Sequence, residues 1–340
     1  MSKTPEFDPR KAQLAANYEV PGILFALAHD RGNAVLYGAG TDYAVHRVDL
    51  NADKPAAKKC WSNHDSYVSS LVLIDGIVVS GGFDRRLIWT NAESGEKLRA
   101  VDAHDGWVRD ITILPGGNLL ASVGDDMLVK IWNAETGELV QTFDGHQKQT
   151  PQGYATALYA VAATPDAKLL ASADRIGEVC VWDVESGKLI NRLKAPTFYT
   201  YDSKKRVRSI GGIRSLCFSP DGSRLVIGGI GQVTNVDGFV GPCRIEIWDW
   251  KAAKRLYTGD DSHKAVLNHV MYHPSEPLLI AAGGGDGGGV LGFWDQKKSK
   301  PIHKVKPKGH IQRFSLDASG RHLYATGFGG FQAWNLFPPS

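Results

Sequence analysis

The sequence has few of the features that mark secreted, membrane-inserted or disulfide-stabilised proteins. It holds four cysteines in 340 residues, none in Cys-x-x-Cys spacing, which argues against a disulfide framework or a cysteine-based zinc site. No stretch approaches about 18 uninterrupted apolar residues, so we expect no membrane span. Residues 1–20 lack an apolar segment of signal-peptide length. Together these absences favour a reducing, cytoplasmic setting.

Charge of one sign and catalytic signatures are also missing. The chain has 39 Lys and Arg against 36 Asp and Glu, a formal net charge of +3, so no global field attracts polyanions. Gly-x-Ser-x-Gly is absent, and no Gly-Lys-Ser/Thr follows the glycine run at 283–289, which we interpret as a turn. His269 and His273 have a zinc-like spacing, but on a strand that spacing spans roughly 13 Å. We expect no enzymatic activity, no cofactor and no metal.

Glycine and regularly spaced tryptophan are plentiful instead. In residues 124–146, Val129 and Ile131 alternate with polar or aromatic neighbours as in a strand, Gly137 supplies a turn, and a second strand begins at Leu139. Similar units end in Trp89, Trp132, Trp182, Trp248, Trp294 and Trp334, at separations of 43, 50, 66, 46 and 40 residues. A weaker copy has Val48-Asp49 where the others have Trp-Asp. The unit is therefore repeated along the whole chain.

This self-similarity at about 40–45 residues, punctuated by Gly-His and Trp-Asp, resembles the WD40 repeat family over essentially the whole chain. Each unit contains four short strands, for example at residues 107–114, 118–124, 128–132 and 139–143. Many short strands at regular spacing predict an all-β propeller. We count seven units and predict a single domain over residues 1–340, a seven-bladed β-propeller of four-stranded blades.

The last blade lacks a fourth strand, because the sequence has six residues after Trp334. An N-terminal strand at about residues 11–20 is a candidate, since Leu14 aligns with Leu98 of the second unit. We expect this strand to complete the last blade and close the ring, because an unpaired outer edge invites aggregation. A short helix or a frayed tail is the alternative.

Polar residues recur in phase with the strands, represented by His104, Ser122, Asp126 and Trp132 in the third unit. The family resemblance implies a hydrogen-bond chain from Trp through Ser and His to Asp inside each blade. Catalysis is the alternative, but a nucleophile site would occur once rather than in every repeat, so we assign these residues a structural role. The first and fifth units depart from the pattern, and Phe328 occupies the Asp position of the last.

Three long connections, at 145–156, 195–212 and 229–243, all fall on the rim that carries the connections between units. Long connections are where binding tends to reside, and aromatic and Arg residues are enriched in interfaces. The candidate partner-binding residues are Tyr67, Trp107, Tyr154, Phe198, Tyr199, Tyr201, Lys204, Lys205, Arg206, Arg208, Phe239 and Arg313. An inert insertion, or core packing for Tyr67 and Trp107, is the alternative.

The resemblance therefore implies a rigid, non-catalytic scaffold for protein–protein interaction through this rim. One alternative is binding of nucleic acid or an acidic partner through basic loops, including the run Lys297, Lys298, Lys300, Lys304, Lys306 and Lys308. Lysines on an edge strand can equally serve to discourage sheet-to-sheet aggregation. A further alternative is an enzyme or small-ligand binder that uses the channel mouth.

Overall fold

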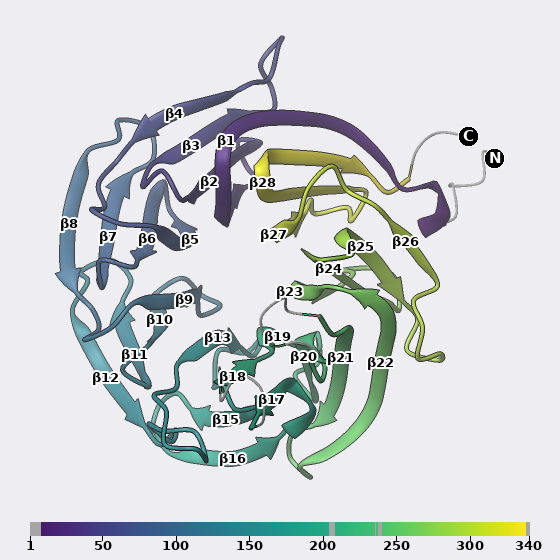
Figure 1. Ribbon diagram of the computed structural model, residues 1–340. Helices are drawn as coiled ribbons and strands as arrows, with labels where there is room; N and C mark the ends of the chain where they lie inside the picture. The colour runs from purple at the N-terminus through teal and green to yellow at the C-terminus, as the bar shows by residue number, and fades with distance from the viewer. Residues whose placement is uncertain (1–7, 204–207, 235, 237–239, 338–340) are drawn as a thin grey trace.

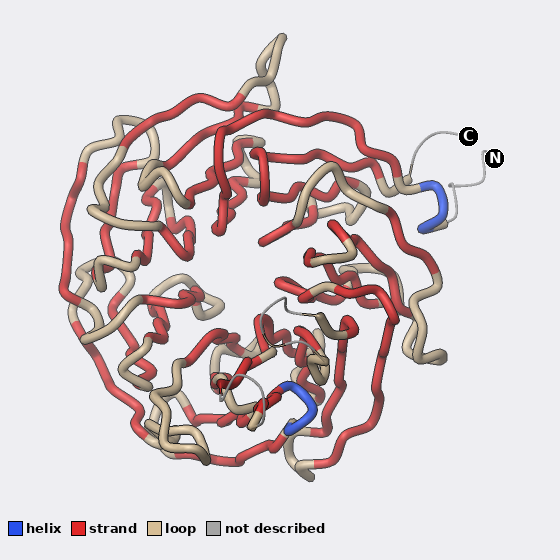
Figure 2. The backbone as a smooth tube through the Cα atoms, in the orientation of Figure 1, coloured by secondary structure: helices blue, strands red, loops and turns tan. Residues whose placement is uncertain are grey.

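The protein is a closed ring of antiparallel sheets around a central channel (Figures 1 and 2). The computed structural model describes residues 8–203, 208–234, 236 and 240–337. Helix is limited in these residues to two three-residue turns, η1 (Pro9–Lys11) and η2 (Pro196–Phe198). Neither is long and apolar enough to cross a membrane.

Five sheets of the ring contain four strands each, ordered from the channel outwards. Their strands are β5 (Val68–Ile74), β6 (Ile77–Gly82), β7 (Arg86–Asn91) and β8 (Lys97–Asp102); β9 (Val108–Ile113), β10 (Leu119–Gly124), β11 (Leu128–Asn133) and β12 (Leu139–Asp144); β13 (Leu158–Ala163), β14 (Leu169–Asp174), β15 (Glu178–Asp183) and β16 (Leu189–Lys194); β19 (Ile213–Phe218), β20 (Arg224–Ile230), β21 (Pro242–Asp249) and β22 (Lys254–Lys264); and β23 (Val266–Tyr272), β24 (Leu279–Gly285), β25 (Gly288–Trp294) and β26 (His303–Val305). A two-stranded hairpin, β17 (Tyr199–Asp202) and β18 (Arg208–Gly211), lies between the third and fourth of these sheets in the chain.

The remaining sheet of the ring has six strands and contains both ends of the described chain. In hydrogen-bonded order its strands are β27 (Ile311–Leu316), β28 (His322–Asn335), β1 (Gln13–Asp30), β2 (Val35–Gly40), β3 (Val45–Asp49) and β4 (Ala57–Trp61). The first half of β1 pairs with β28, with Leu14 opposite Trp334. The second half pairs with β2, with Ala26 opposite Ala39. One strand therefore joins the first and last sequence units.

This arrangement corrects the predicted blade number. Counted as continuous hydrogen-bonded sheets of the described chain, the ring has six blades, and the prediction of seven separate four-stranded blades is wrong. The reason is β1, which runs for 18 residues without interruption. Its register shifts between Glu19 and Ile23, where Gly22 adopts a φ of 93° that disfavours other residues. The strand bends there, and the two units become one sheet.

The hydrophobic core lies between neighbouring sheets, because a single sheet cannot bury both of its faces alone. Val129 and Ile131 of β11, for example, pack in one cluster with Leu158 and Trp182 of the following sheet. Along the outer strands, buried and exposed side chains alternate less strictly. Leu139 of β12, for example, is half-exposed. The inner strands surround the channel and begin at one rim, which fixes where their first side chains point.

Candidate interaction surface and channel mouth

The recurring polar side chains form a continuous chain of hydrogen bonds in the sheet β9–β12. The His104 imidazole lies 2.9 Å from the nearer Asp126 carboxylate oxygen through Nδ1 and 2.7 Å from Ser122 Oγ through Nε2. Trp132 Nε1 donates to the same Ser122 oxygen at 2.8 Å. Burial is the largest single influence on Asp126 and acts to raise its pKa, but the hydrogen bond and charge of His104 and the backbone hydrogen bonds from Asp105 and Leu128 together lower the pKa below its ordinary value. The geometry clamps the loop before β9 onto β10 and β11.

In other sheets, the indole Nε1 of the tryptophan donates to a different kind of acceptor. In the sheet β19–β22, where the sequence has no matching Asp or His, the buried Glu246 accepts from Trp248 Nε1 at 2.9 Å. Arg244 and Arg255 also donate to Glu246. In the last unit, Trp334 Nε1 donates to Gln332 at 3.2 Å. A charged cluster and an amide therefore replace the His–Asp pair.

The three long connections pack against one another on the rim. The Tyr199 hydroxyl donates to Gln152 Oε1 at 2.5 Å, and the rings of Tyr154 and Tyr201 lie 6.5 Å apart. Val233 N donates to Thr200 Oγ1 at 2.9 Å, which ties the third connection to the β17–β18 hairpin. Tyr154 is 41% exposed. Sequence reasoning placed these tyrosines on one surface, and the structure brings them together.

Other candidate residues from these connections do not contribute an exposed side chain. Phe198 is 1% exposed and packs in the core, so assigning its side chain to a binding surface is wrong. The reason is local: η2 turns the ring inward, above the guanidinium of Arg244. Lys204, Lys205, Arg206 and Phe239 lie outside the described residues, as does the side chain of Arg208.

An exposed row of aromatic rings occupies the same rim over the neighbouring sheets. Tyr67 lies 5.7 Å from Tyr43 and 5.8 Å from Phe83, measured between ring centroids. Phe83 stacks on Trp107 at 4.2 Å with the planes nearly parallel. Trp107 is 45% exposed. Sequence reasoning missed Tyr43 and Phe83, although both lie in turns that share the rim with Tyr67 and Trp107.

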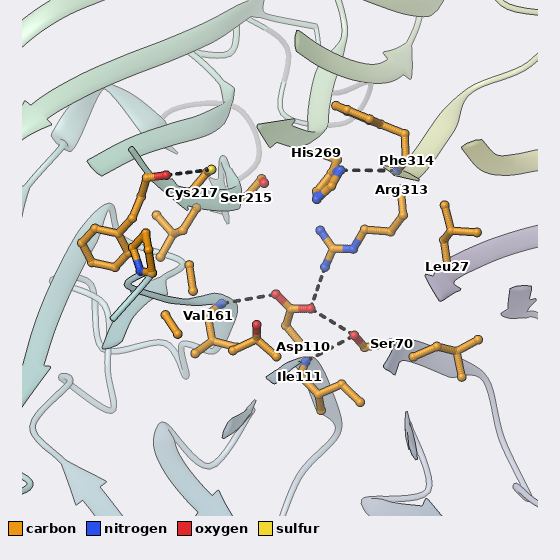
Figure 3. Close-up of a pocket in the computed structure, with 17 residues that line it drawn as sticks. Leu27, Ser70, Asp110, Ile111, Val161, Ser215, Cys217, His269, Arg313 and Phe314 are labelled. Carbon is orange, nitrogen blue, oxygen red and sulfur yellow. Dashed lines mark hydrogen bonds and ion pairs between the residues drawn. The ribbon is translucent and has the colours of Figure 1, made fainter. Parts of the chain in front are cut away.

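Arg313 points into the channel, where an ion pair holds its guanidinium. Its Nη2 donates to Asp110 Oδ1 at 2.8 Å (Figure 3). Asp110 also accepts from Ser70 Oγ at 3.1 Å and from Val161 N at 3.2 Å. Burial raises the pKa of Asp110, and Arg313 offsets part of that rise. The pair borders a cavity of about 320 Å³ inside the channel.

The ionisable side chains of this cavity are poorly suited to catalysis. Burial raises the pKa of the Cys217 thiol to about 11, so the thiol stays protonated and is a weak nucleophile. Burial, followed by the charge of Arg313, lowers the pKa of His269 to about 3. The Nδ1 atom of His269 accepts from Phe314 N at 3.3 Å (Figure 3), so it is already occupied. These groups resemble satisfied interior residues more than an acid–base pair.

One buried cluster has the composition of a metal site. Potential ligand atoms of His146, Glu178 and Cys180 all lie within 4.8 Å of one another. Both imidazole nitrogens of His146 have protein partners, however, in Asp174 and Ser172. Glu178 forms an ion pair with Arg192, and burial raises the pKa of the Cys180 thiol. The potential ligand groups of His146 and Glu178 therefore already have protein partners, and the Cys180 thiol stays protonated.

The lysine run lies at the outer edge of the ring, on β26 and the segments directly before and after it (Figure 1). All six lysines are exposed. Lys304 pairs with Asp261 at 2.7 Å and Lys308 with Glu19 at 2.9 Å. This edge is distinct from the rim that carries the aromatic row.

Comparison with known proteins agrees with the ring of repeated sheets. A sequence model described as "WD domain, G-beta repeat" matches residues 95–133. The chain therefore contains a WD40 repeat and is similar to WD40-repeat β-propeller proteins. The match covers strands β8 to β11 and includes all four residues of the His104 network.

Several curated WD40 relatives are similar over part of their length. The chain is 28% identical over 276 residues, 72% of this chain and 57% of the relative, to "Ribosome biogenesis protein WDR12 homolog" of Chlamydomonas reinhardtii. It is 24% identical over 219 residues, 64% of this chain and 33% of the relative, to human "Pre-mRNA-processing factor 17". It is 32% identical over 124 residues, 36% of this chain and 30% of the relative, to "Small ribosomal subunit protein RACK1y" of Oryza sativa subsp. japonica. The chain thus spans roughly a third to just over half of these relatives.

Proposed function

We propose that this WD40 protein is a non-catalytic scaffold that binds a protein partner through its aromatic rim. The aromatic rim is defined as the exposed row with the tyrosines of the long connections: Tyr43, Tyr67, Phe83, Trp107, Tyr154, Tyr199 and Tyr201. The observation that carries the proposal is that three long connections pack against one another on the rim that also carries the stacked rings of Phe83 and Trp107. The relatives' names, which refer to ribosome biogenesis, pre-mRNA processing and the small ribosomal subunit, support a partner within a protein or ribonucleoprotein assembly.

The chemistry of the aromatic rim suits protein recognition. Tyrosine and tryptophan bury a large area at a small cost in side-chain entropy, which is why they dominate interface energetics. Phe83 and Trp107 already restrain each other by stacking, and Tyr199 is held by Gln152. Such preorganised rings lose little further freedom on binding. The proposed surface is therefore preorganised for binding in the free protein.

The non-catalytic part of the proposal is supported by the channel. His269 is occupied by a backbone amide and Cys217 is held as a thiol, so neither is activated for covalent chemistry. The His104 network recurs around His146 in the next sheet, as structural groups do. The cytoplasmic location stays a prediction from the cysteine pattern.

A double substitution on the aromatic rim tests the proposal. We expect Tyr154→Ala with Tyr201→Ala to weaken partner capture at least about tenfold, because two adjoining rings are removed from the interface. The measurement is capture from native lysate, followed by the dissociation constant of the captured partner after purification. Urea unfolding of both proteins should show that the fold is retained.

The matched control removes exposed apolar surface elsewhere. Leu139→Ala with Val140→Ala truncates two half-exposed side chains of β12, on the outside of the ring. This variant should bind the partner as the wild type does. Equal capture by wild type and the rim variant, or equal losses in the two variants, would show that the rim is not the binding surface.

A further inference from the structure

A second, smaller cavity lies at the mouth of the channel, on the same rim. This mouth pocket has a volume of about 280 Å³, and its polar lining includes Arg109, Arg214, Arg313, Tyr159, Asn268 and Gln312. All six belong to inner strands, at the second or third position after each strand begins. Phe83, which stacks on Trp107 in the aromatic rim, also lines the mouth pocket. Phe83 therefore joins the mouth pocket to the aromatic rim.

The three arginines of the mouth pocket differ in their partners. Arg109 makes two hydrogen bonds to Asp125, at 2.5 and 3.0 Å, and Arg313 pairs with Asp110 at 2.8 Å. Across the described residues, Arg214 forms no ion pair. Its Nη1 donates to two backbone carbonyls, those of Gly211 at 3.0 Å and Ile213 at 2.9 Å. Two of the three guanidiniums are neutralised, and one is not.

Arg214 is also held in place for a ligand. The Tyr159 ring lies 4.4 Å from its guanidinium carbon and covers one face of the group. Burial lowers the pKa of Arg214, and the charges of Arg109 and Arg175 act in the same direction. An arginine nevertheless stays protonated in proteins, so the pocket keeps an uncompensated positive charge. Such a charge in a partly dry pocket is stabilised when an anion enters.

We propose that the mouth pocket receives one carboxylate side chain, an Asp or a Glu, of the partner polypeptide, with Arg214 as its ion-pair partner. This inference rests on the proposed function and names the chemistry that the partner presents. Three guanidiniums and two bound carboxylates leave a local charge of +1, which matches a carboxylate better than a doubly charged phosphoryl group. Phe25 and Phe83 line the same pocket, so an apolar residue next to the acid would be buried as well.

The donors that remain on Arg214 suit this ligand. Its Nε and Nη2 atoms make no hydrogen bond within the described chain, and together they form the fork that carboxylates bind with two parallel bonds. The Gln312 side chain likewise makes no hydrogen bond to another described residue, so its amide can supply one more donor. An amide side chain in place of the acid would leave the Arg214 charge uncompensated. The pocket should therefore distinguish Glu from Gln.

A set of three synthetic peptides tests the inference on the full-length chain. The probes are blocked Gly-Phe-Glu-Phe-Gly, its Gln counterpart and its phosphoserine counterpart, each titrated calorimetrically or by ligand-observed NMR. We expect the Glu peptide to bind at least about tenfold more tightly than the Gln peptide. Equal binding of the Glu and Gln peptides, or preference for the phosphoserine peptide, would overturn the proposal. This comparison uses the wild-type protein alone and does not depend on any variant folding.

Variants then locate the site. Arg214→Gln should reduce binding of the Glu peptide about tenfold or more. Lys54→Gln, which removes an equal charge from the exposed β3–β4 connection at the other rim, should leave it unchanged. If the Glu peptide still binds Arg214→Gln, Arg214 is not the carboxylate site. The proposed function is then judged separately, by partner capture with Tyr154→Ala and Tyr201→Ala. If partner capture instead survives Tyr154→Ala with Tyr201→Ala while Arg214 still binds the peptide, the rim proposal fails and the pocket remains.

Discussion

Buried histidines link the strands and loops of a blade through hydrogen bonds, and His104 allows this role to be tested. His104→Ala removes the group that bridges Asp126 and Ser122, leaving both with an unmet hydrogen bond. We expect the free energy of unfolding to fall by roughly 1–3 kcal/mol. The measurement is the urea midpoint, with an unchanged dependence on denaturant concentration.

An exposed histidine–aspartate pair is the matched control. His322 lies 3.0 Å from Asp317, and its side chain is 48% exposed. Water and salt screen such a pair, so His322→Ala should cost less than about 1 kcal/mol. Similar losses in the two variants would contradict a special structural role for the buried network.

His269 predicts a pH dependence of stability. Its pKa is lowered from 6.5 in the unfolded chain to about 3 in the fold, by burial and then by Arg313. Between these values the unfolded state binds a proton that the folded state does not, so acidification destabilises the fold. Above about pH 6.5 His269 is neutral in both states and does not affect the free energy of unfolding. As the pH falls from 6.5 toward 3, its protonation in the unfolded chain lowers that free energy progressively. Unfolding midpoints measured from pH 7 to 4 should therefore fall less steeply in His269→Gln than in the wild type, and parallel curves would contradict this account.

The tryptophans show what sequence pattern does and does not determine at the residue scale. Their spacing predicted buried strand-ending rings, and Trp89 and Trp294 are each 1% exposed. The pattern did not predict their partners: Trp89 Nε1 donates to Ala134 O in the neighbouring sheet. Trp294 Nε1 has no partner among the described residues. Periodicity reports burial, whereas a hydrogen bond between sheets depends on how neighbouring blades are rotated against each other.

At the scale of elements, β1 predicts how the ring is held closed. Deleting residues 1–18 removes the pairs from Gln13 to Tyr18 opposite β28, and the apolar contact of Ala12 with the cluster around Trp334. Each cross-strand pair contributes roughly 0.2–1 kcal/mol, so we expect the melting temperature to fall by at least about 5 °C. Thermal unfolding followed by circular dichroism measures the change.

The control for this deletion is a shorter one. Removing residues 1–7 leaves every pair between β1 and β28 in place, so its melting temperature should match that of the full chain. A melting curve for the 1–18 deletion that coincides with the full-length curve would mean that the pairing adds no stability.

The same element shows why the blade number escaped prediction. From sequence, an N-terminal strand is predicted at about residues 11–20 and the first unit is counted separately, and Pro21 and Gly22, which commonly end regular structure, lie between them. In the fold, the ladder to β28 shifts register there and the strand continues into its pairing with β2. Likewise, the long connections were recognisable by their length, but the inward turn of Phe198 depends on packing across two sheets. Local sequence marks an insertion and does not determine which of its side chains is buried.

At the scale of the whole molecule, the aromatic rim and the lysine edge are separate surfaces with different chemistry. The chain is nearly neutral, at +3, so positive charge is local rather than global. Lys297, Lys298 and Lys300 are exposed and form no ion pair within the described chain. They precede β26 on the outer edge of the ring (Figure 1), whereas Phe83 of the aromatic rim lines the channel mouth. A partner bound at the mouth need not touch the lysines.

Charge reversal of these lysines therefore separates the two modes of binding. We expect Lys297→Glu, Lys298→Glu and Lys300→Glu together to leave partner capture within about twofold of the wild type, whereas the rim variant loses it. If the edge instead binds nucleic acid, each lysine that neutralises a phosphate adds about 0.9 to the slope of log affinity against log salt concentration for duplex DNA. The measurement pairs partner capture with gel-shift titrations of duplex DNA and single-stranded RNA at several salt concentrations. Capture that disappears on charge reversal but survives Tyr154→Ala with Tyr201→Ala would move the functional surface from the rim to the lysine edge, because removal of the rings would then have cost nothing.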